Sequence, residues 1–457
     1  MTEGRRSPAA GLIWLAALCT AAAGCSRQGV PAAGGPGTPD RITLGWSGDP
    51  ARTMSVTWRT SGASATATGE VAAFTADPSA LTPLATSPAT TSRLDLGAGR
   101  TVYSHRVTFT GLAPGTPYWY RVGDGPRWSE WFRFRTASAA AEPFRFIYLG
   151  DAQNEIRSKW SRAVREALLA APDARFVVHA GDLVAEGWDD ALWGEWTAAQ
   201  GFAAAMIPSL PTPGNHDLHR VPGDPAGSGI SAVNALWRAQ FTLPHNGPAD
   251  VPELADEAWF LDYQGVRIVS LDANMYTEGD FDPSLKARAA ASQLAWLDRV
   301  LADNPNSWTI VVHHEPVYSV GNSRDNADLR AALLPIYDRR HVDLVLQGHD
   351  HAYGRTHRLA AGRPVAPGEA GTVYAVSVSG PKMYPLNKKF LDLMAATRTN
   401  TQMFQVISVS GDRLSYEARS ITGDLVDAFE LRKGAAGAST LTGLVPGRPT
   451  PAGGAAR

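Results

Sequence analysis

The stretch Val342-Asp343-Leu344-Val345-Leu346-Gln347-Gly348-His349-Asp350-His351 joins an apolar run directly to two histidines. Three other apolar runs also end in metal-type ligands. They are residues 144–149 before Gly150-Asp151-Ala152-Gln153, 176–180 before Gly181-Asp182-Leu183, and 308–312 before His313-His314-Glu315-Pro316. A fifth cluster reads Gly214-Asn215-His216-Asp217. Short apolar runs are typical of buried strands, and open α/β sheets place their sites at the carboxyl ends of such strands. The five clusters therefore predict one polar site at one edge of a sheet.

The composition is that of a globular protein of 457 residues, with 19% charged and 44% hydrophobic residues. Its formal net charge is −2, so we expect no nucleic-acid-binding surface. The length exceeds a single core and predicts two or three domains. The only cysteines, Cys19 and Cys25, lie near the N-terminus. A metal ion in the body of the protein would therefore be held by His, Asp and Asn.

Residues 1–25 are typical of an export signal. Arg5 and Arg6 precede an apolar stretch that is too short to span a bilayer comfortably. Ala22-Ala23-Gly24-Cys25 then resembles a bacterial lipobox, in which Cys25 becomes lipidated. We therefore expect an exported lipoprotein anchored to a bacterial membrane, either periplasmic or at the cell surface. The alternative is a plain secretory signal that ends in the same region.

The rest of the chain predicts two domains joined by small-residue segments. Residues 26–40 form a Gly-, Pro- and Ala-rich linker, and 41–137 show short alternating strands with turn signals, as in an all-β sandwich. Residues 143–432 alternate apolar strands with helices, as in a layered α/β domain. A hairpin is expected at 259–271, and strands at about 372–379, 402–409 and 413–419 are expected to complete a second sheet. The tail 433–457 is expected to be disordered.

The clusters have the ligand types of a two-metal site. Such a site needs one carboxylate shared by both ions, private ligands for each, and an open edge for substrate and water. Asp182 suits the shared position because Gly181 allows a tight turn before it. Asp151 would be a terminal ligand and Asn215 a neutral amide ligand. The imidazoles would come from His314, His349 and His351.

Together the five clusters resemble the signature of the calcineurin-like metallophosphoesterase superfamily. With a fibronectin type III-like sandwich in front, the chain resembles the purple acid phosphatases from about residue 40 to 432. The resemblance implies an α/β/β/α four-layer second domain. It also implies a first metal held by Asp151, Asp182 and His351. The second metal would share Asp182 and take ligands from Asn215, His314 and His349. The His-x-Pro pattern of the family selects His314 over His313, which is then expected to be structural.

The sequence departs from the purple acid phosphatases at the first metal. The family's tyrosine, whose phenolate binds ferric iron and gives the colour, corresponds to Ala185, and another superfamily ligand, a histidine, corresponds to Gln153. Either the Gln153 amide oxygen coordinates the ion, or Gln153 hydrogen-bonds beside it. A Fe(III)-tyrosinate centre is therefore not expected. We expect a colourless protein with two divalent ions, such as Mn, Fe or Zn.

The expected reaction is hydrolysis of phosphate monoesters by in-line attack of a metal-bridging hydroxide. His216 is predicted to stabilise charge or protonate the leaving oxygen, with Asp217 orienting its imidazole. Asn322 and Arg355 are predicted to line the substrate opening. Residues 319–325 contain none of the histidines that purple acid phosphatases often carry there, so an acid pH optimum is not assumed.

Two alternative functions remain open from the sequence. One is a phosphodiesterase that acts on nucleotides or phospholipid head groups, because the ligands are shared between the two activities. The other is a cell-surface binding module with a relic metal domain. In either phosphoesterase the expected partner is a small phosphorylated substrate, and the protein is expected to contact a membrane only through its lipid anchor. The sequence leaves the oligomeric state open.

Overall fold

The computed structural model describes residues 37–218, 235–277, 283–366, 368–434 and 439–443. The expected signal over residues 1–25, the lipidation site Cys25 and the linker up to residue 36 lie outside the described residues. Within these ranges, none of the helices combines the length and the apolar character needed to span a membrane.

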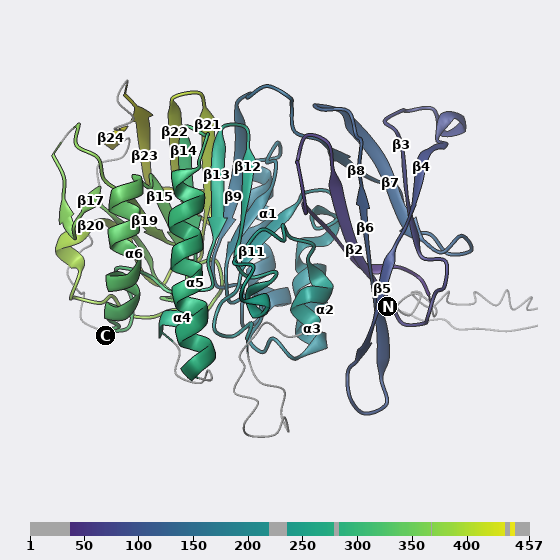
Figure 1. Ribbon diagram of the computed structural model, residues 1–457, viewed down its shortest axis with the longest axis horizontal. Helices are drawn as coiled ribbons and strands as arrows, with labels where there is room; N and C mark the ends of the chain where they lie inside the picture. Colours follow the sequence, from purple (N-terminus) through teal and green to yellow (C-terminus); the bar gives the residue numbers. More distant parts are fainter. Residues whose placement is uncertain (1–36, 219–234, 278–282, 367, 435–438, 444–457) are drawn as a thin grey trace, which may run out of the picture.

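The N-terminal domain is a sandwich of two four-stranded sheets (Figure 1, right). The first sheet has the order β1 (Asp40–Gly45), β2 (Met54–Thr60), β6 (Thr101–Phe109) and β5 (Thr90–Asp95). The second has the order β4 (Pro83–Pro88), β3 (Thr68–Ala73), β7 (Pro117–Gly123) and β8 (Phe132–Arg135), with the short helix η1 (Pro78–Ala80) between β3 and β4. The predicted all-β sandwich is confirmed.

Alternating aromatic residues form the core of this sandwich. Phe109, Tyr120 and Phe134 are at most 3% exposed. Their ring centroids lie 5.7 to 6.4 Å apart. Because side chains alternate between the two faces of a strand, this pattern turns one face of each sheet toward the other. These three rings therefore pack the core rather than forming a ligand-binding platform.

The second domain contains two seven-stranded sheets. The first has the order β11 (Ser209–Thr212), β10 (Val177–Ala180), β9 (Phe144–Leu149), β21 (Met403–Ser410), β22 (Arg413–Ser420), β23 (Leu425–Lys433) and β24 (Ser439–Gly443). Strands β9, β10 and β11 are parallel, and β21 runs antiparallel to β9. The three parallel strands therefore share one carboxyl edge.

The second of these sheets has a parallel centre. Its order is β12 (Trp259–Tyr263), β13 (Val266–Ser270), β14 (Trp308–Val312), β15 (Leu344–Gln347), β19 (Val373–Val376), β16 (Tyr353–Thr356) and β20 (Met394–Arg398). Strands β13, β14, β15 and β19 are parallel, and β12 with β13 forms the predicted hairpin. A small ribbon pairs β17 (Leu359–Ala360) with β18 (Arg363–Pro364).

The second domain also contains helices and short helical turns. They are η2 (Ile156–Trp160, π-helical), α1 (Ser161–Ala170), α2 (Asp190–Gln200), η3 (Gly201–Ala203), α3 (Ala235–Gln240), η4 (Pro252–Leu254), α4 (Asn274–Thr277), α5 (Pro283–Ala302), α6 (Ala327–Arg340) and η5 (Leu391–Leu393). Helices α5 and α6 lie in front of the second sheet, and α1 packs on β21 of the first (Figure 1). The predicted α/β/β/α layering is confirmed.

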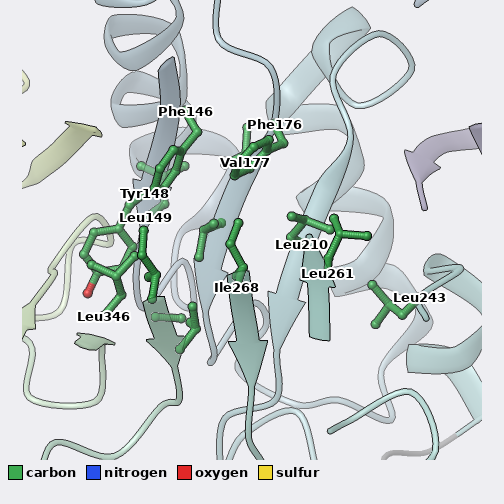
Figure 2. Close-up of a cluster of buried hydrophobic side chains, with 14 of the residues drawn as sticks. Phe146, Tyr148, Leu149, Phe176, Val177, Leu210, Leu243, Leu261, Ile268 and Leu346 are labelled. Carbon is green, nitrogen blue, oxygen red and sulfur yellow. The ribbon is translucent and has the colours of Figure 1, made fainter. Parts of the chain in front are cut away.

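The two sheets face each other across one apolar core. Figure 2 shows Phe146 and Leu210 from the first sheet in the same cluster as Ile268 and Leu346 from the second. The backbone N–H of Gln347 donates to the Tyr148 hydroxyl oxygen at 2.8 Å, and that hydroxyl donates to the Gln347 carbonyl. These bonds join β9 to β15. The carboxyl ends of the two sheets are thereby held side by side.

Two expectations about the C-terminal part were wrong. Residues 403–410 and 413–420 join the first sheet rather than the second, because β21 pairs with the otherwise open side of β9. The tail expected from residue 433 also contains a strand, since β24 pairs antiparallel with β23. In both places an unpaired strand edge gains backbone hydrogen bonds from the next segment of the chain, which composition alone does not reveal.

The sandwich is fixed to the second domain by polar contacts. Asp190 of α2 receives both Arg41 Nη1 at 2.6 Å and Arg59 Nη1 at 2.9 Å. The Tyr120 hydroxyl donates to the Ala205 carbonyl oxygen at 2.6 Å. Asp190 and the two arginines are at most 19% exposed in their side chains. Removing the Asp190 carboxylate would take a partner from two nearly buried arginines, so these contacts hold the domains in one arrangement.

Candidate metal centre

The predicted ligands lie in loops that begin where parallel strands end. The residues after the first-sheet strands are Asp151 (β9), Asp182 (β10) and Asn215 (β11), and those after the second-sheet strands are His314 (β14), His349 and His351 (β15). We expected one edge of one sheet. Instead, the carboxyl ends of two facing sheets supply the residues, because the Tyr148–Gln347 bonds hold β9 against β15.

Four of these residues have a left-handed backbone. The φ angles of Asp151, Asp182, His349 and His351 are 54°, 51°, 73° and 47°. Non-glycine residues rarely adopt this region, and each instance costs about 1–3 kcal/mol, so such strain concentrates at functional sites. It turns each side chain sharply away from the strand that precedes it. The surrounding packing maintains four strained residues in one place, which indicates a binding site.

Glycine is required directly before Asp182. Gly181 has a φ of 79°, and a Cβ on it would lie 2.5 Å from His314 Nδ1. A Cβ on Gly214, in the next loop, would lie 2.3 Å from Asp182 Oδ1. The two glycines therefore let the β10 and β11 loops approach the same carboxylate. This confirms the tight turn expected from Gly181.

Asp182, His314 and His349 form one ligand group. His314 Nε2 lies 3.1 Å from Asp182 Oδ2 and 3.1 Å from His349 Nδ1. Because a carbonyl oxygen can only accept, the contact of 2.7 Å between His314 Nδ1 and Ala180 O places the proton on Nδ1. Nε2, the ring nitrogen that a metal ion could use, therefore faces Asp182 and His349. Metal-binding histidines typically have this arrangement, with the second ring nitrogen donating to a carbonyl.

Asp151, Asp182 and His351 form a second ligand group. All ligand atoms of each group lie within 4.8 Å of one another, and Asp182 belongs to both groups. His351 Nε2 lies 3.8 Å from Asp151 Oδ1. The backbone N–H of His349 donates to both Asp151 oxygens, at 2.8 and 2.9 Å, and thereby fixes that carboxylate. The geometry places Asp182 where the sequence predicted the shared ligand.

Two amide oxygens in the site have no hydrogen-bond partner. They are Asn215 Oδ1 and Gln153 Oε1, and Gln153 is fully buried. Gln153 Nε2 lies 2.7 Å from Asp182 Oδ2 and 3.2 Å from His351 Nε2. Rotating the amide by half a turn would direct Oε1 to this position. Buried orphaned oxygens beside carboxylates and imidazoles are suited to two hard or borderline cations, so the residues present fit a dinuclear metal site.

The buried charges of the site compensate one another. Burial raises the pKa of Asp151 to about 8. Burial acts the same way on Asp182, but the charge and hydrogen bond of His314 outweigh it and lower the Asp182 pKa well below its usual range. Burial opposes the charge on His314, yet Asp182 raises the His314 pKa well above its usual range. Burial lowers the pKa of His351 to about 3. His351 is therefore neutral near pH 7, which is the form in which imidazole binds a metal.

His216 lies at the edge of the site, but Asp217 does not orient it as expected. His216 Nδ1 donates to the Ala185 carbonyl oxygen at 2.7 Å, and its backbone N–H donates to Asp182 Oδ1 at 2.9 Å. The fully buried Asp217 instead accepts the backbone N–H groups of Leu183 and Gly214 at 3.0 and 2.9 Å. Asp217 therefore fixes the two ligand loops, and a backbone carbonyl holds the imidazole.

Of the two residues predicted to line the substrate opening, Arg355 is buried and Asn322 is exposed. Arg355 is 5% exposed, and its Nε and Nη2 donate to Asp427 at 2.9 and 2.7 Å. That interpretation of Arg355 is wrong, because its guanidinium is held in a buried ion pair with Asp427. Asn322 is exposed, and its backbone N–H donates to the Pro385 carbonyl oxygen.

Sequence reasoning missed Arg324. Arg324 Nη1 donates to the carbonyl oxygen of His349 at 2.6 Å. It lies two residues beyond Asn322 in the segment noted for its missing histidines. Its basic side chain was the available signal, but the fold was needed to place it beside a ligand. His313, by contrast, stacks on Tyr337 and contacts the Glu315 carbonyl oxygen, as expected of a structural histidine.

Comparisons with known families agree with this geometry. The Calcineurin-like phosphoesterase family matches residues 144–353, the region that carries the five clusters up to His351. Residues 144–353 therefore form a calcineurin-like phosphoesterase domain. The Purple acid Phosphatase N-terminal domain matches residues 39–136, the sandwich. The two matches together give the chain the domain architecture of the purple acid phosphatases.

Individual relatives are distant. The chain is 26% identical over 294 residues to an uncharacterized protein of Mycobacterium tuberculosis. The matched region covers 59% of this chain and 54% of that protein. This chain therefore spans about half the length of that relative. It is 28% identical over 343 residues to human acid phosphatase type 7, covering 69% of this chain and 70% of that protein.

A solved structure shows the same fold. The purple acid phosphatase from yellow lupin (Lupinus luteus) seeds matches with a TM-score of 0.70 and 18% sequence identity, over 88% of this chain and 75% of that chain. At this identity the likeness concerns the fold alone. It confirms the order of a sandwich followed by a phosphoesterase domain.

Proposed function

We propose that this protein is a two-metal hydrolase of phosphate monoesters. The observation that carries the proposal is the position of Asp182, whose carboxylate is shared by both ligand groups. A carboxylate shared in this way holds two cations close together, an arrangement typical of phosphatases and related hydrolases. The family match to calcineurin-like phosphoesterases supports the same reaction class.

The cations and the chain would have separate tasks. Two bound divalent cations would supply an activated water molecule and positive charge for the phosphoryl oxygens. Asp182 would supply negative charge to hold them, Asp151 would do so after losing its proton, and His314 is oriented by Ala180 O. His216 is held by Ala185 O, and the other ring nitrogen, Nε2, would reach the leaving oxygen. As an imidazolium it would give that oxygen a proton.

The ligand set supports divalent rather than ferric ions. Ala185 has no side-chain donor, and the position of Gln153 beside Asp182 and His351 supplies a neutral amide. An anionic phenolate is the hard ligand that stabilises Fe(III), and neither residue provides one. Mn, Fe(II) or Zn therefore suit the centre, with Gln153 as a ligand of the ion bound by Asp151 and His351.

Replacing Gln153 by leucine is expected to weaken binding of one of the two metal ions by roughly 10–100-fold, because a buried oxygen donor is lost. Titration of metal into the apoprotein, followed by calorimetry, measures this change. Gln405→Leu is the matched control. Gln405 lies on β21, its side chain is fully buried, and its amide atoms have no hydrogen-bond partner among the described residues. The iron-loaded wild type is expected to be colourless. A visible tyrosinate charge-transfer band, or equal affinities in wild type and Gln153→Leu, would contradict the ligand assignment.

Hydrolysis assays after single-metal reloading test the proposed function. Apoprotein reloaded with Mn, Zn or Fe(II) is expected to cleave phenyl phosphate faster than bis(4-nitrophenyl) phosphate. A preference for the diester would support the alternative activity, a phosphodiesterase for nucleotides or phospholipid head groups. Failure to cleave either ester with any metal would support a binding module with a relic metal domain. The complete ligand set argues against the relic, because buried acidic groups without a function are costly to keep.

We also propose that the protein acts outside the cytoplasm. The motif at Cys25 supports a lipid anchor as the only membrane contact, and the formal net charge of −2 supports small phosphorylated molecules rather than nucleic acid as partners. Detection of acylated Cys25 by mass spectrometry of the membrane fraction tests the anchor, and a Cys25→Ala variant is the control.

A further inference from the structure

Three side chains form a cationic rim beside the histidine ligands. We use the term cationic rim for Arg324, Lys382 and Tyr384. The Tyr384 ring meets the His351 ring edge to face, with centroids 4.9 Å apart, and its backbone N–H donates to the His351 carbonyl oxygen at 3.0 Å. Arg324 and Lys382 both lie over this ring, at 5.3 and 5.5 Å from its centroid. One aromatic ring thus holds two cations next to a ligand.

Among the described residues, the Arg324 guanidinium makes hydrogen bonds through Nη1 alone. Its Nη1 donates to the His349 carbonyl oxygen at 2.6 Å and lies 3.4 Å from Asp350 Oδ1. Asp350 also accepts Ser319 Oγ and the Gly321 N–H, so its charge does not depend on Arg324 alone. The Arg324 side chain is 26% exposed. Its remaining N–H groups have the planar geometry that suits two oxygens of a phosphoryl group.

Lys382 has no acidic partner in the described part of the chain. Its described contact is the Tyr384 face, and the residue as a whole is partly exposed. A cation–π contact leaves most of the charge available to an anion. Lys382 therefore presents positive charge beside His351 in addition to that of Arg324 and the cations of the metal centre.

Two loops hold the rim in place. The backbone of Gly321 bridges to Leu386, and the Asn322 N–H donates to the Pro385 carbonyl oxygen at 3.0 Å. Asn387 Nδ2 donates to the Arg324 carbonyl oxygen at 2.8 Å. The segment that carries Arg324 is thus fastened to the segment that carries Lys382 and Tyr384. A site fixed by backbone bonds needs little reordering when a ligand binds.

We infer that the cationic rim binds the substrate, with Arg324 holding the phosphoryl group and Lys382 holding a second anionic group of the same molecule. The inference deepens the proposed function and rests on it. The metal centre and Arg324 already supply positive charge for one phosphoryl group, so Lys382 is in excess for a substrate whose leaving group carries no charged group of its own. A charge placed beyond the reacting group discriminates among substrates more than it accelerates the chemistry. The substrate class is therefore a phosphate ester that carries another phosphate or carboxylate.

The first experiment compares three substrates that differ in one group. Phenyl phosphate has no second anion, 4-carboxyphenyl phosphate has a carboxylate, and 1,4-phenylene bisphosphate has a second phosphate. Wild type is expected to prefer at least one of the latter two by about tenfold in kcat/KM, mainly through KM. Lys382→Gln is expected to remove that preference, so that the two charged substrates are cleaved no better than phenyl phosphate. The two charged substrates distinguish the two kinds of second anion.

The second experiment measures binding of inorganic phosphate and pyrophosphate to the metal-loaded protein by calorimetry. Arg324→Gln is expected to weaken phosphate binding by about tenfold, and Arg324→Lys by less, because lysine keeps the charge and loses the fork. Lys382→Gln is expected to weaken only pyrophosphate. Arg330→Gln is the matched control. Like Arg324, Arg330 donates to a backbone carbonyl, that of Val317, and lies over an aromatic ring, that of Phe390. Its described contacts do not include a predicted metal ligand.

The outcomes separate the rim from the proposed function. A wild type that cleaves all three esters equally, with Lys382→Gln unchanged, would overturn the inference and leave the proposed function intact. Absence of hydrolysis with every metal would overturn the proposed function, and the calorimetric comparison would still decide whether the rim binds anions. Equal losses in Arg324→Gln and Arg330→Gln, or a loss of bound metal in Arg324→Gln, would show that Arg324 is only structural.

Discussion

Asp182→Asn is expected to lower phosphate ester hydrolysis by roughly a thousandfold or more and to reduce the bound metal from two ions to one or none. Asp182 is the one side chain shared by both ligand groups, and it lies 3.1 Å from His314 Nε2. Loss of a residue that only supports a ligand costs about 10–100-fold in affinity or activity, so loss of the shared ligand itself costs more. Elemental analysis together with steady-state kinetics measures both changes.

A second buried aspartate provides the control for this substitution. Asp343 is 3% exposed and pairs with Lys433, but it precedes β15, at the opposite end of that strand from His349. Asp343→Asn is expected to reduce stability while keeping two metal ions and activity. Metal added to the wild-type apoprotein is expected to raise its Tm, because the folded state binds it, whereas Asp182→Asn should show a smaller rise. Full metal content in Asp182→Asn would refute the shared role.

The sequence predicted well which polar side chains come together, because they follow a simple physical pattern. An apolar run that ends in a polar cluster marks a strand whose carboxyl end faces a site, and this pattern located Asp151, Asp182, His314 and His349. The sequence reasoning also separated His314 from its neighbour His313, which the structure places in a packing contact with Tyr337. Such a pattern involves only a strand and the loop that follows it, so it can be recognised without knowing how distant segments pair.

Features that depend on pairing between distant segments were not predictable in this way. The carboxyl ends of the two sheets are held together by a contact between Tyr148 and Gln347, which lie 199 positions apart in the sequence. Arg355 next to a glycine-histidine motif suggested a substrate contact, but its partner Asp427 lies 72 positions further along the chain. Arg324 was overlooked for the same reason, since its position depends on contacts with His349 and Tyr384.

The orientation of His216 shows a related limit. Asp217 is the acidic neighbour in sequence, and a carboxylate is a common partner of a catalytic imidazole. The chain instead directs Asp217 to the N–H groups of Leu183 and Gly214, and Ala185 O holds the imidazole. Adjacent residues in a tight turn point to different sides, so adjacency in sequence does not imply contact. Ala185 thus takes part in the site through its backbone even though it lacks the family's phenol.

His216→Ala is expected to lower kcat for phosphate monoesters by about 10²–10⁴-fold with little change in KM or metal content, the range typical for loss of a general acid–base group. The backbone N–H bond from His216 to Asp182 Oδ1 at 2.9 Å remains in the variant, so the metal site is preserved. The loss is expected to be larger for substrates with poor leaving groups, such as alkyl phosphates, than for nitrophenyl phosphate, which needs little protonation.

His216→Asn separates catalysis from structure at the same position. The asparagine amide nitrogen can replace Nδ1 in the bond to Ala185 O, but nothing replaces Nε2. If His216 donates a proton through Nε2, His216→Asn and His216→Ala lose turnover to the same extent, and both lose the dependence of the rate on an imidazolium. If His216 only fixes the loop, the asparagine variant recovers the activity that the alanine variant lacks. The ratio of the two kcat values therefore decides the role of this residue, with equality supporting general acid catalysis.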